Sequence, residues 1–358
     1  IMLIGLGIFG LKAQSLEILA SADKTDIITG ELIKYTLKYK CASTTTNCTM
    51  VTMTATIPSG IIIQDQTIGL TSDISGYTIS PDHKMITFTF NEPLTAGNTG
   101  IIEFDGTALL GLANGTPATL TADILSNGTS IDSAIVNTTI HSYNSFCPQL
   151  AGGFGLGLDN TTAYTINLRR AVDWAYGVEN IGDVHVVDQL PANTIIDSVV
   201  LFTEYPYLFT QPLGTVNVTG NSFTVDIPAS NMNVYQNNYT TTIQVRVYVR
   251  YPDPPFTAGQ SVTNSVTITQ QPIGGGTPIV YTNNTNTSFF YSGNGTYSTV
   301  GERSCTTILD ATDILQVPFS KLNVSKSGFT NVRPGEAGSY ILTFANQGNT
   351  VLDNIVVE

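Results

Sequence analysis

The chain has 358 residues, enough for two or three domains that each bury a core of their own. Only 11% of its residues are charged, and the formal net charge is −13. This acidic balance argues against nucleic acid as a partner, because phosphate binding needs clustered lysine and arginine. The low charge content, together with many β-branched residues, favours strands joined by turns over helices.

A short apolar segment, Ile1 to Ala13, opens the chain. It is too short to span a bilayer and matches the hydrophobic region and cleavage site of a secretory signal peptide without its basic leading residues. We therefore expect an exported protein, secreted or held at the cell surface, that is cleaved after Ala13. We expect no membrane span in the sequence given.

A first module is predicted over residues 15–142. Its clearest strands alternate in character, because side chains two apart share one face of a strand. The alternating residues are Tyr35, Leu37 and Tyr39, and then Ile86, Phe88 and Phe90. Frequent turn signals between such runs predict many short antiparallel strands.

A second module is predicted over residues 144–272. We expect a strand on which Trp174, Tyr176 and Val178 alternate, with Trp174 as a core anchor. A second strand, Thr242–Arg250, turns Ile243, Val245, Val247 and Val249 inward and Gln244, Arg246, Tyr248 and Arg250 outward. Residues 273–320 are expected to form an extra hairpin or a linker.

Residues 321–358 repeat the pattern a third time, with Tyr340, Leu342 and Phe344 alternating. One strand pair is too small to bury a sandwich core, so this third module is predicted to be incomplete. Recurrence of a half-buried strand pair indicates tandem modules that arose by duplication. No reactive residue recurs with the pattern, which favours a protein that binds or spaces over an enzyme.

These features resemble the tandem "conserved repeat" domain of bacterial secreted and surface proteins. The family's Pro-Gly, alternating strand and Asn-x-Gly follow one another from Val332 to Asn349, and its Asp-x-Leu-Pro stands at Asp188–Pro191. Asn264 matches the family's closing Asn strand, whereas Cys41 replaces the Asn in the first module. The resemblance implies tandem Ig-like antiparallel β-sandwiches, frequent in adhesins, and no defined activity.

The four cysteines fit an oxidising compartment, and they allow three pairings. Cys41 and Cys48 flank a polar loop, and Cys147 and Cys305 bracket the second module. On these grounds we predict the disulfides Cys41–Cys48 and Cys147–Cys305.

Two further kinds of site have candidate residues. Asp310 and Asp313 are candidate calcium ligands at the end of the second module, although two acids do not specify a site and an exposed turn explains them too. Related surface modules sometimes join a strand Lys to a strand Asn beside an acid, for which Lys34, Lys38, Asn137 and Asn264 are candidates. No catalytic motif, and no cofactor other than calcium, is expected.

The expected role is therefore structural or adhesive, as a stalk or binding array of a large exported surface protein. Its partner would be a protein or glycan on a host or neighbouring cell, contacted through loops such as 42–47 and 203–215. The alternative is a carbohydrate-binding or enzyme-associated module. For that alternative, Tyr205, Tyr207 and Phe209 are candidate sugar-stacking rings, although packing on the sandwich explains them too.

Overall fold

The computed structural model describes residues 15–152, 161–210, 212–252, 254–257, 259–273, 275–315, 322–328, 331, 333–347 and 352–357. In these ranges the chain is built from strands, with one four-residue helix, α1 (Ala229–Met232), and three short 3-10 turns. The all-β prediction is confirmed. The predicted signal peptide, residues 1–13, lies outside the described residues.

The chain divides into two compact units, here named unit 1 and unit 2. Unit 1 contains the chain up to residue 145 together with two later segments, 174–180 and 289–303. Unit 2 contains residues 146–173, 181–288 and those from 304 onward. The module boundaries predicted from the sequence differ from these units. The predicted boundaries follow the repeat pattern, which does not show that residues 174–180 and 289–303 pack in unit 1.

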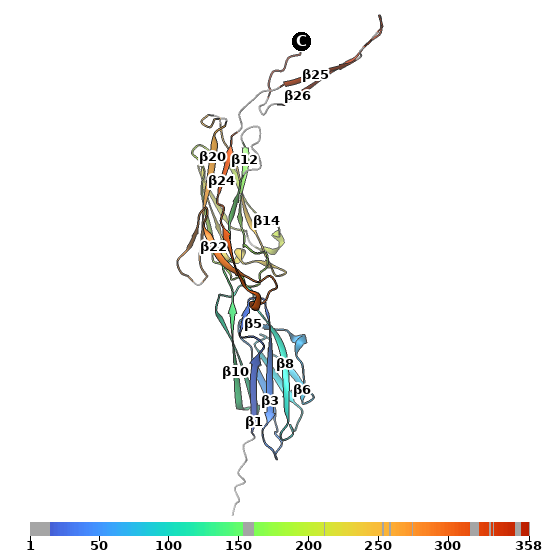
Figure 1. Ribbon diagram of the computed structural model, residues 1–358, viewed down its shortest axis with the longest axis vertical. Helices are drawn as coiled ribbons and strands as arrows, with labels where there is room; N and C mark the ends of the chain where they lie inside the picture. The colour runs from blue at the N-terminus through green and yellow to red at the C-terminus, as the bar shows by residue number, and fades with distance from the viewer. Residues whose placement is uncertain are drawn as a thin grey trace, which may run out of the picture. The chain divides into compact units, whose positions relative to one another are not determined.

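Unit 1 is a sandwich of a four-stranded sheet, ordered β1-β3-β8-β5, and a six-stranded sheet, ordered β2-β10-β9-β4-β7-β6. β1, β3 and β8 lie side by side as antiparallel neighbours (Figure 1). The strands and the 3-10 turn are β1 (Leu16–Ala22), β2 (Asp26–Ile28), β3 (Leu32–Cys41), β4 (Val51–Thr56), β5 (Ile61–Ile63), η1 (Asp65–Thr67), β6 (Ile74–Ile79), β7 (Met85–Phe90), β8 (Thr99–Ala108), β9 (Thr116–Ser126) and β10 (Thr129–His141).

The core of unit 1 follows from the alternation read in the sequence. β3 buries Tyr35, Leu37 and Tyr39 and turns its lysines outward, and β7 buries Ile86, Phe88 and Phe90. Rings from the two strands meet in the core, where Tyr39 and Phe90 pack edge to face with centroids 4.8 Å apart. Burial of alternate apolar side chains is the main stabilising contribution to such a sandwich.

Two segments from later in the sequence complete unit 1. The backbone N–H of Asn180 donates to the carbonyl of Gly111 at 3.0 Å, and the N–H of Tyr143 donates to the carbonyl of Gly177 at 2.8 Å. The buried carboxylate of Glu31 accepts the N–H of Tyr297 at 2.9 Å. Backbone hydrogen bonds therefore hold residues 174–180 to the rest of unit 1, and the buried carboxylate of Glu31 holds residues 289–303.

Unit 2 contains a four-stranded sheet, ordered β11-β12-β19-β14, and a larger sheet in which β15, β16, β13, β20 and β21 follow one another and β24 also pairs with β20. The elements that follow β10 in the chain are β11 (Gln149–Ala151), β12 (Thr161–Leu168), β13 (Val184–Gln189), β14 (Ile195–Thr203), η2 (Pro206–Leu208), β15 (Thr215–Thr219), β16 (Ser222–Ile227), α1, β17 (Tyr235–Gln236), β18 (Tyr239–Thr240), β19 (Ile243–Arg250), β20 (Ser261–Gln270), β21 (Ile279–Tyr281), β22 (Asn286–Tyr291), η3 (Tyr297–Thr299), β23 (Gly301–Thr306), β24 (Asp310–Ile314), β25 (Leu322–Gly328) and β26 (Tyr340–Asn346). Three further pairs, β17 with β18, β22 with β23 and β25 with β26, form two-stranded sheets.

The predicted strand around Trp174 is wrong. Trp174 is 43% exposed and belongs to a segment that packs in unit 1, so it does not anchor the core of the second sandwich. The strand that corresponds to β3 is β12, which carries the fully buried Tyr164 and pairs with β19 as β3 pairs with β8. Residues 169–180 lie between β12 and β13 and interrupt the repeat. Trp174, Tyr176 and Val178 within them alternate as the residues of a strand do, and this local pattern caused the wrong prediction.

The strand predicted over Thr242–Arg250 is confirmed. It is β19, which buries Ile243, Val245, Val247 and Val249, as its alternation predicts. Residues 273–315 contribute β21 and β24 to the larger sheet and the β22–β23 pair, and β25 pairs with β26. The described part of the chain has no helix with the length and apolar character that crossing a bilayer requires.

Candidate binding surface

The aromatic segment predicted as a ligand contact directly follows β14 in unit 2. Pro206 at the first position favours the short turn η2, which holds the rings of Tyr205 and Tyr207 edge to face with centroids 6.2 Å apart. Tyr207 is 69% exposed, and its hydroxyl accepts a hydrogen bond from Gln236 Nε2. Phe209 packs partly against the core, so Tyr205 and Tyr207 are the two rings left for a ligand.

A second group of side chains lies on the outer face of the sheet that contains β14. The guanidinium of Arg246 on β19 lies 4.1 Å from the ring centre of Phe202 on β14, a cation–π contact. Gln244 Oε1 accepts a hydrogen bond from Arg246 Nη2 at 3.0 Å and so fixes the guanidinium. Tyr248, two residues further along β19 on the same face, is 42% exposed.

We define the aromatic surface as Phe202, Tyr205, Tyr207, Arg246 and Tyr248. Tyrosine, phenylalanine and arginine are enriched at protein interfaces, where they supply large contact areas at a low cost in conformational entropy. The strand pattern placed Arg246 and Tyr248 on an outer face, but nothing in the sequence marked Phe202. Its role depends on the pairing of β14 with β19, in which Phe202 lies opposite Gln244.

Unit 2 also contains a buried acid–amide pair on its larger sheet. Asp188 on β13 and Asn264 on β20 are both fully buried, and Asn264 Nδ2 donates to Asp188 Oδ2 at 2.9 Å. Burial raises the pKa of Asp188 from 3.8 to about 7, and the hydrogen bond from Asn264 only partly opposes this. The second oxygens of both side chains, Asp188 Oδ1 and Asn264 Oδ1, have no hydrogen-bond partner among the described residues.

These two unpaired oxygens are complementary once Asp188 holds a proton. A neutral Asp188 has one O–H donor, and Asn264 Oδ1 is an acceptor, so a second hydrogen bond would close a ring between the two side chains. An ionised Asp188 has only acceptors and leaves both oxygens unpaired inside the sandwich. The pair is internal, so we assign it to the stability of unit 2 and not to ligand binding.

The structure does not bring the two calcium candidates together. Asp310 and Asp313 are three residues apart on β24, so their side chains leave opposite faces of the strand. Asp310 Oδ2 accepts a hydrogen bond from Asn283 Nδ2 at 2.7 Å. Asp313 lies on the inward side near the hydroxyls of Tyr164 and Tyr251, which hydrogen-bond to each other, and it helps burial to raise the pKa of both tyrosines. Among the residues that the structure describes, no group of three or more His, Cys, Asp or Glu side chains is placed to hold a metal ion.

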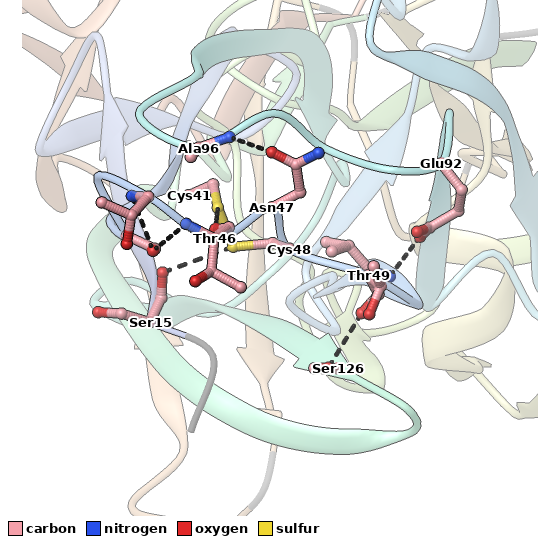
Figure 2. Close-up of a disulfide and its surroundings, with 12 residues drawn as sticks. Ser15, Cys41, Thr46, Asn47, Cys48, Thr49, Glu92, Ala96 and Ser126 are labelled. Atoms are coloured by element: carbon pink, nitrogen blue, oxygen red, sulfur yellow. Dashed lines mark hydrogen bonds between the residues drawn. A yellow bond between two sulfur atoms is a disulfide. The ribbon is translucent and has the colours of Figure 1, made fainter. Parts of the chain in front are cut away.

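Both predicted cysteine pairs occur as disulfides in the structure, Cys41–Cys48 and Cys147–Cys305. Figure 2 shows how polar contacts fix the chain around the first of them. Asn47 Oδ1 accepts the backbone N–H of Ala96 at 3.1 Å, and Glu92 Oε1 accepts the N–H of Val51 at 2.7 Å. The 42–47 loop is therefore anchored at Asn47, and its residues 44–47 remain exposed.

Three of the four candidate isopeptide residues have other partners. Lys34 Nζ lies 3.9 Å from Glu103 Oε2, and Asn137 Oδ1 accepts a hydrogen bond from Thr119 Oγ1 at 3.0 Å. Asn264 pairs with Asp188, and residues 146–320 contain no lysine that could join it. Lys38 lies on the outward face of β3, away from the core side chains of that strand.

No family model matches the chain, and no curated protein matches it. Among solved structures, it is similar to the C-terminal domain of the Streptococcus agalactiae AgI/II polypeptide BspA, at 9% identity over 74% of this chain and 98% of that one, with a TM-score of 0.27. It is also similar to the collagen adhesin CNA of S. aureus, at 13% identity over 82% of this chain and 94% of that one, with a TM-score of 0.26. The Enterococcus faecalis MSCRAMM ACE gives 14% identity over 82% of this chain and 96% of that one, with a TM-score of 0.27.

At TM-scores this low, the similarity does not establish a shared fold. The assignment of an all-β sandwich rests on the strand pairing and the two buried cores described above.

Proposed function

We propose that this chain is a non-enzymatic structural and adhesive segment of an exported surface protein, in which sandwich modules act as a stalk or binding array. The observation that carries the proposal is the aromatic surface of unit 2. Phe202, Tyr207 and Tyr248 are exposed, and Tyr205 and Arg246 are half-buried, although unit 2 has a packed core of its own, so this exposure is not explained by folding. Two disulfides support an oxidising, extracellular location.

The modular organisation belongs to the same proposal. Two sandwich modules, predicted over 15–142 and 144–272 and completed by strands from the stretch 273–320, and the start of a third module from 321 would provide reach along a surface protein. The β25–β26 pair supports the third module, because it repeats the pairing of β1 with β3. The export signal over residues 1–13 and the "conserved repeat" family remain part of this proposal.

The binding of a carbohydrate is the second candidate function. The exposed ring of Tyr207, held edge to face by Tyr205, is a suitable platform for stacking on a sugar. A glycan array and an array of extracellular proteins, probed with the purified chain, would separate the two. Selective glycan binding that Tyr205→Ala and Tyr207→Ala abolish would favour the carbohydrate module, whereas protein binding that the same variants weaken would favour the adhesive segment.

A further inference from the structure

The outer edge of β14 is an exposed strand edge in unit 2. Among the edge strands in the described ranges, β14 is the longest, with nine residues. The strand that pairs with β8 at the corresponding edge of unit 1, β5, has three residues. In the described structure, the backbone of Ile195–Thr203 pairs with β19 on one side and with no strand on the other.

The edge strand β1 of unit 1 differs from β14 because a side chain covers part of its backbone. On β1, the N–H of Ile18 is capped by Asp132 Oδ2 at 2.9 Å, at an irregularity in β10. β14 has a register shift only near its start, between Ile196 and Ser198, where Asp197 is paired with Arg250. Beyond it, the stretch Ser198–Thr203 is regular and exposes Val200 (47%) and Phe202 (38%). A regular, exposed and apolar edge is the form that readily adds a strand from another chain.

The charge next to this edge indicates what the added strand would carry. The guanidinium of Arg246 lies over the ring of Phe202, which belongs to the edge strand itself. Its hydrogen bonds go to the neutral side chain of Gln244, and none of the ion pairs of the described residues involves it. A cation held at an open edge without an acid is complementary to a carboxylate on the next strand.

We propose that β14 accepts an extended strand of another protein as a fifth strand of the sheet β11-β12-β19-β14, and that this strand carries a carboxylate on its outer face, where it meets Arg246. The inference rests on the proposed binding function and names the class of partner. Another protein is favoured over a second copy of this chain, because the net charge of −13 opposes self-association.

Two synthetic heptapeptides of alternating Thr and Val, one with Glu and one with Lys at the centre, test the proposal on the full chain. Hydrogen exchange followed by NMR should show that the Glu peptide protects alternate amides of Ser198–Thr203, because an added strand bonds to every second residue of an edge. We expect the Glu peptide to bind about threefold to fivefold more tightly than the Lys peptide, the size of an exposed ion pair. Arg246→Gln should abolish that preference, and Arg169→Gln, which removes an exposed arginine just beyond β12, should leave it intact.

Equal binding of both peptides, or protection elsewhere in the chain, would overturn the proposal. Sedimentation that depends on concentration in the wild type, and no longer does so in Val200→Lys, would show that the chain dimerises through β14. That result would also overturn the proposal, because the added strand would then come from a second copy of this chain. If neither peptide binds but a glycan or protein binds through Tyr205 and Tyr207, strand addition is wrong while the proposed binding function stands. If no array ligand binds either, both are wrong.

Discussion

Replacing Asp188 by asparagine should stabilise unit 2 at neutral pH. In the wild type, the folded state holds a proton on Asp188 up to about pH 7, whereas an exposed aspartate loses it near 3.8. Protonation of the folded state therefore contributes stability that is fully present below about pH 4 and is lost as the pH rises through about 7. In the variant, an asparagine at 188 and Asn264 would exchange two amide hydrogen bonds, and neither side chain would titrate.

The size of the effect follows from the difference in proton affinity. A tenfold change in affinity corresponds to about 1.4 kcal/mol, so the difference between 3.8 and about 7 amounts to about 4 kcal/mol. We expect Asp188→Asn to lie within about 1 kcal/mol of the wild type at pH 4 and to exceed its stability by up to about 4 kcal/mol at pH 8. The gain should appear progressively between these two values.

Denaturant unfolding, followed by circular dichroism at pH 4, 6 and 8, measures this difference directly. Asp188→Leu is the matched control, because it removes the charge but leaves the amide of Asn264 without its partner, at a cost of about 1–3 kcal/mol. It should therefore be less stable than Asp188→Asn at every pH. A variant Asp188→Asn that is less stable than the wild type at pH 8 would refute the reasoning, because it would mean that the ionised carboxylate has a stabilising partner.

Three further predictions concern the segments and disulfides. Glu31→Ala removes the carboxylate that pairs with Lys24 and accepts the N–H groups of Ile28 and Tyr297. It should destabilise unit 1 by about 3 kcal/mol in thermal or denaturant unfolding, and an unchanged unfolding midpoint would contradict this. Gly111→Val should raise hydrogen exchange in residues 174–180, because Gly111 has a φ of +74° and an added Cβ would lie 2.1 Å from the side chain of Asn180. Gly115→Val is the control, since an added Cβ there meets open space. Removing Cys147–Cys305, which closes 158 residues, should cost about 5 kcal/mol, against about 2 kcal/mol for Cys41–Cys48 in the chain-entropy model; the reverse order would contradict it.

The strands that could be predicted are those in which local alternation matches burial. β7 and β19 alternate without interruption, and both bury the residues that the sequence indicated. The strand around Trp174 was mistaken because residues 174–180 alternate in the same way but pack in unit 1, in contact with residues far away in the sequence. Periodicity reports which face of a segment is apolar, and it contains no information on which part of the chain covers that face.

The candidate surface was predictable only in part. Tyr205 and Tyr207 stand out in the sequence as closely spaced aromatics, and the outward positions of Arg246 and Tyr248 follow from β19. Phe202 joins them only through the register of β14 on β19, which no local pattern fixes. The same holds for Asp188 and Asn264, whose contact needs the pairing of β13 with β20.

The most direct test of the account is the binding of the fluorescently labelled full chain to host and neighbouring-cell surfaces, compared with a variant that carries Phe202→Ala, Tyr205→Ala and Tyr207→Ala. Tyr77→Ala, which removes a partly exposed ring from unit 1, is the control. We predict saturable binding by the wild type and by the control, and its loss in the triple variant with unfolding midpoints unchanged. Undiminished binding by the folded triple variant would contradict the claim that the aromatic surface of unit 2 is the adhesive site.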